Sequence, residues 1–201
     1  MKRVLLAVAT TLVAASAAGA ATAADLGPDF RGAGDARLFV GVLARCHDRD
    51  PGDTARLAAR CPDADELATA LFVAGRTSRP PETILALRAQ GKSWWEVGGK
   101  LGLPADAWFP ALRHEPGPPY NRAYAAWRRL REKQEPLPGL DDTQARDLAG
   151  VRLLGEYFGV PPETAMAWRA GGQDARLLVA TEYHRRHPAG AAAPAPEGRR
   201  K

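Results

Sequence analysis

The sequence has few of the residues and none of the motifs that usually mark an enzyme or a metalloprotein. It contains two cysteines and four histidines in 201 residues, and it has no serine–histidine–aspartate order, metal-ligand motif or glycine-rich phosphate loop. Arg113, His114 and Glu115 form the only acid–base cluster in a predicted loop. His184 and His187 have no third metal ligand near them in the sequence. We therefore predict a protein that is not an enzyme and holds no metal ion or cofactor.

Runs of alternating β-branched residues are also missing, which argues against β-strands. The chain instead consists of short amphipathic segments that begin at proline or a small polar residue and end at glycine, a pattern typical of helices. We expect Asp35 and Asp53 to cap the first two helices. Asp63 begins a third, and Asp106 caps a short helix that holds Trp108. The predicted fold is all-α: a compact array of short helices with two related helical hairpins, preceded by a signal peptide.

Only the N-terminal segment contains an extended apolar run. Lys2 and Arg3 precede the apolar residues Val4–Val13, and small residues follow as far as Ala24. This order is typical of a secretory signal peptide, cleaved after Ala23 or, in the frame that we favour, after Ala24. The strongly apolar part is too short to span a membrane, and no later segment approaches that length. We therefore expect a periplasmic or secreted protein without a membrane span after signal cleavage.

Cys46 and Cys61 are the only cysteines. An even pair in an exported protein predicts a disulfide. The turn at Asp48–Asp53 separates two predicted antiparallel helices, and we expect this arrangement to bring the two sulfur atoms together. Haem attachment would need a second cysteine before His47, and a structural zinc site would need more ligands than these residues supply.

The stretch Pro80–Leu103 reads as two helices around a tight turn. Gly91 supplies the left-handed residue that ends the first helix, and Gly102 ends the second. Between them, Ser93 and Glu96 have the spacing of a capping box. The pattern is that of a helix-turn-helix that reads DNA, but a purely structural helical hairpin has the same features.

The first half of this stretch recurs 81 residues later. Pro161–Gly172 matches Pro80–Gly91 at eight of twelve positions, which indicates one structural unit used twice. Asp174 stands where Ser93 stands, and both residue types are good N-caps. The tryptophans are not repeated at equivalent positions, so the two units share a backbone plan without sharing a surface.

Composition divides the chain into five parts. These are a signal peptide (1–24), a flexible leader (25–34), an N-terminal helical region with the first hairpin (35–135), a C-terminal helical region with the second hairpin (140–187) and a disordered tail rich in alanine, proline and glycine (188–201).

One predicted helix, from Asn121 to about Gln134, is strongly basic. The whole chain carries a formal charge of +5, which is too small by itself to indicate nucleic-acid binding. The helix concentrates positive charge and is the best candidate for an anion-binding face, the alternative being an ordinary solvated surface. The residues of this candidate face are Arg122, Arg128, Arg129 and Arg131.

Three segments of the chain resemble a family of small secreted bacterial helical proteins that are largely uncharacterised. They are ETILALRAQGKSWWEVGGKLGL, GPPYNRAYAAW and LLGEYFGVPPETAMAWRAGG, and the resemblance covers the chain from about Leu67 to His184. The resemblance implies an exported, helical protein with a repeated helix-turn-helix-like hairpin. It implies no catalytic residues.

These observations favour a non-enzymatic exported protein that binds a partner in the cell envelope. Aromatic side chains dominate interface energetics, so the candidates for partner contact are the aromatic residues of the hairpin and of the basic helix, unless these rings belong to the core. They are Trp94, Trp95, Tyr120 and Trp127. The alternative function is a helix-turn-helix-like nucleic-acid-binding protein, against which the predicted signal peptide argues.

Overall fold

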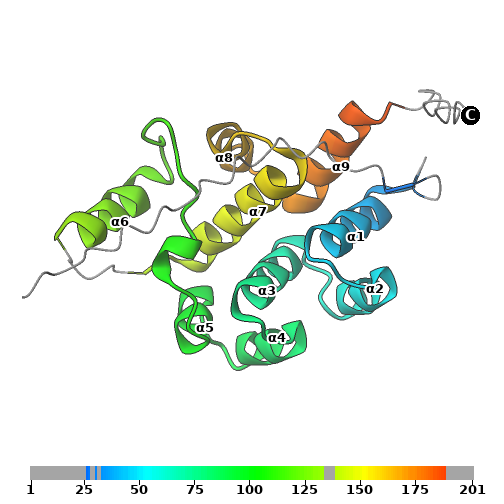
Figure 1. The fold of residues 1–201 in the computed structure, drawn as a ribbon, viewed down its shortest axis with the longest axis horizontal. Coiled ribbons are helices and arrows are strands. Elements are labelled where there is room, and N and C mark those ends of the chain that lie inside the picture. The colour runs from blue at the N-terminus through cyan, green and yellow to red at the C-terminus, as the bar shows by residue number, and fades with distance from the viewer. Residues whose placement is uncertain (1–25, 28–29, 31–32, 134–138, 189–201) are drawn as a thin grey trace, which may run out of the picture.

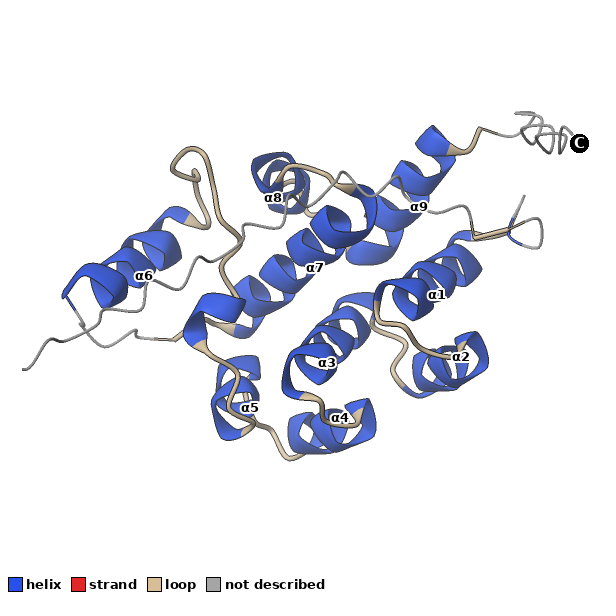
Figure 2. Ribbon diagram, in the orientation of Figure 1, coloured by secondary structure: helices blue, strands red, loops and turns tan. Residues whose placement is uncertain are grey.

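Nine α-helices make up most of the described residues, 26–27, 30, 33–133 and 139–188, of the computed structural model (Figure 1). No strand occurs in these ranges (Figure 2). The all-α prediction is therefore confirmed. The predicted signal peptide, much of the predicted leader, residues 134–138 and the predicted tail from residue 189 onward lie outside the described part of the chain.

The helices follow one another with short connections. In chain order they are α1 (Asp35–Cys46), α2 (Pro51–Arg60), α3 (Ala64–Thr77), α4 (Pro81–Ala89), α5 (Trp94–Lys100), α6 (Asn121–Lys133), α7 (Asp142–Phe158), α8 (Pro162–Ala170) and α9 (Ala175–Arg186).

Most helix starts follow the local chemistry predicted for them. The Ser93–Glu96 capping box forms at α5, where the Ser93 backbone N–H donates to Glu96 at 2.8 Å and the Glu96 backbone N–H donates to the Ser93 hydroxyl at 3.2 Å. Asp63 caps α3, and Asp174 caps α9. Such caps satisfy backbone N–H groups that have no partner inside the helix.

Two of the expected starts are displaced. Gly34 rather than Asp35 is the N-cap of α1. α2 begins at Pro51, because Asp50 accepts a hydrogen bond from the Asp53 backbone N–H at 2.8 Å. Asp53 therefore lies inside the first turn, where the helix dipole favours its charge, and it is not the cap.

The helix expected after Asp106 is also shorter than predicted. It is a three-residue 3-10 helix, η2 (Ala105–Ala107), and Trp108 and Phe109 follow it as buried residues in a loop. Pro110 comes next, and a proline cannot donate the backbone hydrogen bond that would continue the helix.

The repeat extends further than the sequence match. Ser78 ends α3 and Gly159 ends α7, both in the left-handed conformation and 81 residues apart. Gly91 and Gly172, also 81 apart, have φ values of +79° and +80°. Each unit is therefore three helices long, α3–α5 in the first and α7–α9 in the second.

The two units pack on each other instead of forming separate domains. α3 and α7 lie side by side at the centre, α8 packs on α7, and α1 packs against α2 and α9 (Figure 1). The N-terminal and C-terminal helical regions thus share one hydrophobic core. The largest fully buried side chains are Trp94, Trp108, Tyr120, Phe39 and Phe158. None of the described helices is both long and apolar enough to cross a bilayer.

Candidate functional site

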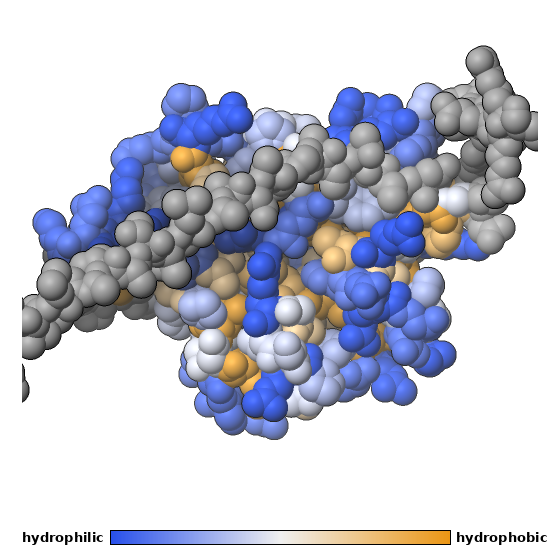
Figure 3. All heavy atoms as spheres, viewed as in Figure 1, coloured by the Kyte–Doolittle hydropathy of each residue, from blue (hydrophilic) through white to orange (hydrophobic). Residues whose placement is uncertain are grey.

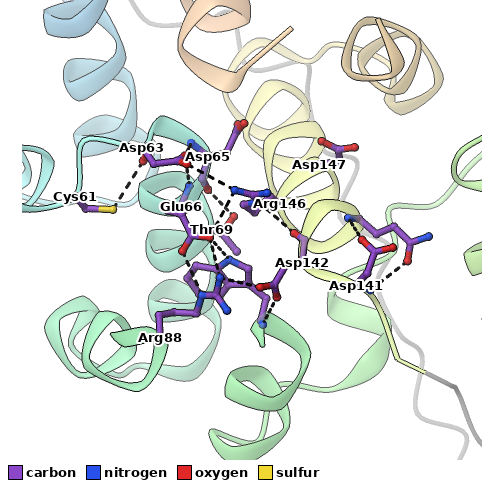
Figure 4. A network of polar contacts seen from close by, with 12 residues as sticks. Cys61, Asp63, Asp65, Glu66, Thr69, Arg88, Asp141, Asp142, Arg146 and Asp147 are labelled. Atoms are coloured by element: carbon purple, nitrogen blue, oxygen red, sulfur yellow. Dashed lines mark hydrogen bonds and ion pairs between the residues drawn. The ribbon is translucent and has the colours of Figure 1, made fainter. Parts of the chain in front are cut away.

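A network of charged side chains lies between the two repeat units (Figure 4). In the first unit, Arg88 on α4 contacts Glu66 on α3 and Asp142 at the start of α7, each through Nη2 at 2.9 Å. The guanidinium also lies 4.7 Å from the centre of the Trp94 ring. Trp94 in turn donates its indole N–H to Glu66 at 3.0 Å.

The second unit has the same arrangement around Arg169 on α8. Its Nε and Nη2 donate to Asp147 Oδ1 on α7 at 3.0 and 2.5 Å, and its Nη1 donates to Asp65 Oδ1 on α3 at 2.8 Å. Nη1 also donates to the backbone carbonyl of Gln173 at 2.9 Å. This guanidinium therefore makes four hydrogen bonds inside the protein.

Each unit also supplies an acceptor to a helix of the other unit. Asp142 of the second unit accepts a hydrogen bond from the Trp94 backbone N–H at the start of α5, at 2.7 Å. Asp65 of the first unit accepts one from the Ala175 backbone N–H at the start of α9, at 3.0 Å. A carboxylate at a helix N-terminus is stabilising, so these contacts fix how the two units dock.

The carboxylates of this network favour the charged form of both arginines. Burial alone would lower the pKa of Arg169, but hydrogen bonds and charge from Asp65 and Asp147 outweigh it and raise the pKa. The pKa of Arg88 is raised in the same way by Glu66 and Asp142, against the effect of burial. Both arginines therefore stay charged, and each bridges carboxylates from the two units.

The predicted disulfide is wrong, because Cys46 and Cys61 are free thiols in the structure. Cys46 ends α1, beside the turn into α2, whereas Cys61 follows the far end of α2. A ten-residue helix is about 15 Å long, and a disulfide requires Cα atoms within about 7 Å. The antiparallel packing of α1 and α2 therefore separates the two cysteines.

The two thiols lie in different surroundings. Burial, reinforced by the charge of Glu156, raises the pKa of Cys46 to about 12. Cys61 donates a weak hydrogen bond to the Asp63 carbonyl and lines a small apolar hollow beside Phe39 and Val40 of α1. Burial raises its pKa as well. Neither cysteine has the lowered pKa of a nucleophile.

The four aromatic residues predicted for partner contact divide into two pairs. Trp94 and Tyr120 are core residues, with 0 % and 2 % of their surface exposed, and the Tyr120 hydroxyl donates to Asp147 at 3.1 Å. Trp95 and Trp127 are partly buried, and the Trp95 ring lies against Gly139. Of the four, only Trp95 and Trp127 have exposed aromatic surface.

The basic helix α6 is held by its aromatic face. Trp127 stacks on Phe109 with ring centres 5.2 Å apart, and its indole N–H donates to Asp106 at 2.7 Å. The Tyr124 hydroxyl donates to the Pro110 carbonyl at 2.9 Å. The apolar side of α6 is therefore fixed to the loop that follows α5, and the rest of the helix projects from the molecule (Figure 1).

The other face of α6 is positively charged. Five of its thirteen residues are basic and only Glu132 is acidic, and hydrophilic side chains cover this part of the surface (Figure 3). Arg122, Arg129 and Arg131 are exposed, and Arg131 lies over the Trp127 ring at 5.2 Å. Arg128 is half-buried and pairs with Glu115. The predicted anion-binding residues thus lie together on one helix.

The remaining sequence candidates do not form a site in the described residues. The Arg113 backbone N–H donates to Glu163 at 2.6 Å, and Glu115 is engaged by Arg128, so the cluster around His114 does not converge. His184 lies 3.8 Å from Asp35. No group of three or more histidine, cysteine or acidic side chains placed to bind a metal ion occurs within the described ranges.

The sequence did contain a signal for the network between the units, although the motif search missed it. Arg88 and Arg169 are a matched pair in the repeat, and their partners Glu66 and Asp147 are also 81 residues apart. Extending the repeat backwards by one helix would have aligned two acidic residues with two arginines. Comparison of the chain with protein-family models, curated proteins and solved structures found no match.

Proposed function

We propose that this chain is a non-enzymatic exported protein that binds a protein partner with an acidic surface in the cell envelope, and that α6 makes the contact. The supporting observation is that the apolar face of α6 packs against Phe109, while its basic face is exposed to solvent. The basic side chains of this face differ in burial from those that hold the fold together. Arg88 and Arg169 are largely buried in ion pairs, whereas Arg122, Arg129 and Arg131 are exposed.

A basic face of this kind suits recognition of an acidic partner. Clustered like charges steer association and discriminate between partners, more than they add affinity. The half-buried rings of Trp127 and Trp95 supply apolar contact area, which a purely charged surface would lack. The interaction should therefore be fast, specific for acidic surfaces and weakened by salt.

The alternative function is recognition of nucleic acid by the helical hairpins. The N-termini of the helices that would read DNA carry negatively charged side chains, which oppose this function. Asp142 and Glu96 lie at the N-terminus of α5, and Asp65 and Asp174 lie at the N-terminus of α9. DNA-binding helices bring this end to the phosphates or bases. Carboxylates there repel the phosphate backbone, so the hairpins favour a structural role.

The test uses two triple variants of the mature chain, alongside the wild type, as bait in an envelope extract. The first carries Arg122→Gln, Arg129→Gln and Arg131→Gln on α6. The control removes three exposed charges elsewhere through Arg45→Gln, Arg60→Gln and Lys100→Gln. We expect the α6 variant to lose at least tenfold in affinity for the captured protein, and the control to match the wild type.

The same proteins should be tested against duplex DNA at low salt. Equal capture by both variants would contradict a role for α6, as would capture that is unaffected by salt. Salt-dependent DNA binding that is lost in the α6 variant would favour the nucleic-acid alternative over an envelope protein.

A further inference from the structure

A hollow of about 380 Å³ lies where the ends of α1 and α3 meet the start of α4, away from α6. Its wall includes His47 and Arg49 from the α1–α2 turn, Ser78 and Arg79 from the α3–α4 connection, and Glu82 from the first turn of α4. Neither the network between the units nor the proposed contact face uses these side chains. The hollow therefore needs an explanation of its own.

The arginines of this wall have unused hydrogen-bond donors. The Nε atom of Arg49 is buried and has no hydrogen-bond partner. No carboxylate in the described ranges forms an ion pair with Arg49 or Arg79, in contrast to Arg88 and Arg169. An unpaired buried donor on a charged group is costly, and a guanidinium offers a planar fork of donors that matches phosphate oxygens.

His47, in the same wall, lies near two positively charged side chains. Burial, followed by the charges of Arg49 and Arg76, lowers the pKa of His47 to about 4. Arg76 is paired with Glu156, and Glu82 is the acidic residue in the wall of the hollow. The imidazole is therefore neutral at pH 7 and lies near the positive charges of Arg49 and Arg76. A bound anion would offset these charges.

We propose that this hollow binds a phosphate group, with Arg49 and Arg79 as its charged donors and the Ser78 hydroxyl and the His47 ring beside them. The volume exceeds that of an inorganic phosphate ion, so the site has room for the small organic group of a phosphomonoester. Glu82, which also lines the hollow, opposes the charge of the ligand. This proposal is independent of α6 and of the envelope partner.

The primary test is calorimetric titration of the full mature chain with inorganic phosphate and with glycerol phosphate at pH 7, in buffer free of phosphate. We expect saturable binding to one site. Arg49→Gln combined with Arg79→Gln should weaken it at least tenfold, and Glu82→Gln should strengthen it. The control, Arg60→Gln combined with Lys100→Gln, removes the same charge from exposed positions elsewhere and should bind as the wild type does.

NMR titration of the histidine rings locates the ion, with His47 assigned from the spectrum of a His47→Asn variant. Phosphate should raise the pKa of His47, whereas sodium chloride at equal ionic strength should not. The proposal is overturned if millimolar phosphate gives no saturable heat, if the His47 titration is unchanged when phosphate is bound, or if the double arginine variant binds normally while circular dichroism shows it to be folded.

Vesicles distinguish a soluble phosphate from a lipid headgroup. Flotation with vesicles that contain phosphatidic acid, dependent on Arg49 and Arg79, would identify a phospholipid as the source of the phosphate group. Calorimetric binding of glycerol phosphate without flotation would identify a soluble phosphomonoester. Since the α6 variant retains this hollow, loss of partner binding and loss of phosphate binding are separable results.

Discussion

Arg88 and Arg169 are equivalent residues of the two repeat units, yet they are buried to different extents. Each binds a carboxylate of its own unit, Glu66 or Asp147, and a second carboxylate from the other unit. The side chain of Arg88 remains 17 % exposed and that of Arg169 only 5 %. Equivalent ion pairs thus join the two units at two places, and the pair around Arg88 is more exposed to solvent than the pair around Arg169.

The first prediction follows from this difference. Arg169→Ala leaves Asp65 and Asp147 without their counter-charge in a dry site, so it should lower the free energy of unfolding by about 3–5 kcal/mol. Arg88→Ala should cost less, about 1–2 kcal/mol, because water reaches its partners. Urea denaturation followed by circular dichroism measures both. If Arg169→Ala does not fold, Arg169→Lys, which keeps the charge without the planar fork, should fold with intermediate stability.

The second prediction concerns two adjacent glycines inside α5. A Cβ atom on Gly99 would meet nothing within 4 Å, so Gly99→Ala should raise the free energy of unfolding by about 0.5–1 kcal/mol. A Cβ atom on Gly98 would lie 3.2 Å from the Trp108 ring and 3.3 Å from Leu103. Thermal melts should therefore rank Gly98→Ala below Gly99→Ala. The reverse order would mean that α5 does not pack closely on Trp108.

The third prediction concerns the cysteines. The denatured protein should react with two equivalents of a thiol reagent, because no disulfide joins Cys46 to Cys61. In the native protein at pH 8, Cys61 should be labelled before Cys46, whose pKa is raised to about 12 by burial and by Glu156. Mass spectrometry of the labelled peptides gives the order. A count of zero thiols would show that the cysteines are paired after all.

The fourth prediction is a loss of stability in mild acid. The pKa of His47 falls from 6.5 to about 4 on folding, because of burial and the nearby charges of Arg49 and Arg76. Between these values the unfolded chain takes up a proton that the folded chain does not, so lowering the pH from about 6.5 to about 4 favours unfolding. Urea midpoints in phosphate-free buffer should fall across this range. His47→Gln should flatten the dependence by about one proton.

Local chemistry was the part of the fold that the sequence predicted best. Ser93 and Glu96 stand three residues apart and form the expected capping box, and Gly91 and Gly172 end their helices with positive φ. Such interactions are settled within one helical turn, and their energies do not depend on which helix packs nearby. The two predicted caps that differ, Gly34 instead of Asp35 at α1 and Asp50 instead of Asp53 at α2, each lie within one turn of the predicted residue.

Predictions that required a distance between helices were less successful. The pairing of Cys46 with Cys61 was inferred from an antiparallel turn, but it neglected the length of α2 between them. The aromatic residues show the same limit. Trp94 and Trp95 are neighbours in one short helix, and only the packing of α3 and α7 decides that the first is fully buried and the second is not.

The amino-acid sequence on its own determined that the fold is helical, where most of its helices start and stop, and that one unit occurs twice. Each of these depends on residues a few positions apart or on direct comparison of two segments. The tertiary structure alone decided which arginines are paired and which face a hollow or solvent. Burial and charge pairing are properties of three-dimensional neighbours: Asp65 meets Arg169 across 104 residues of chain, and no local pattern encodes that contact.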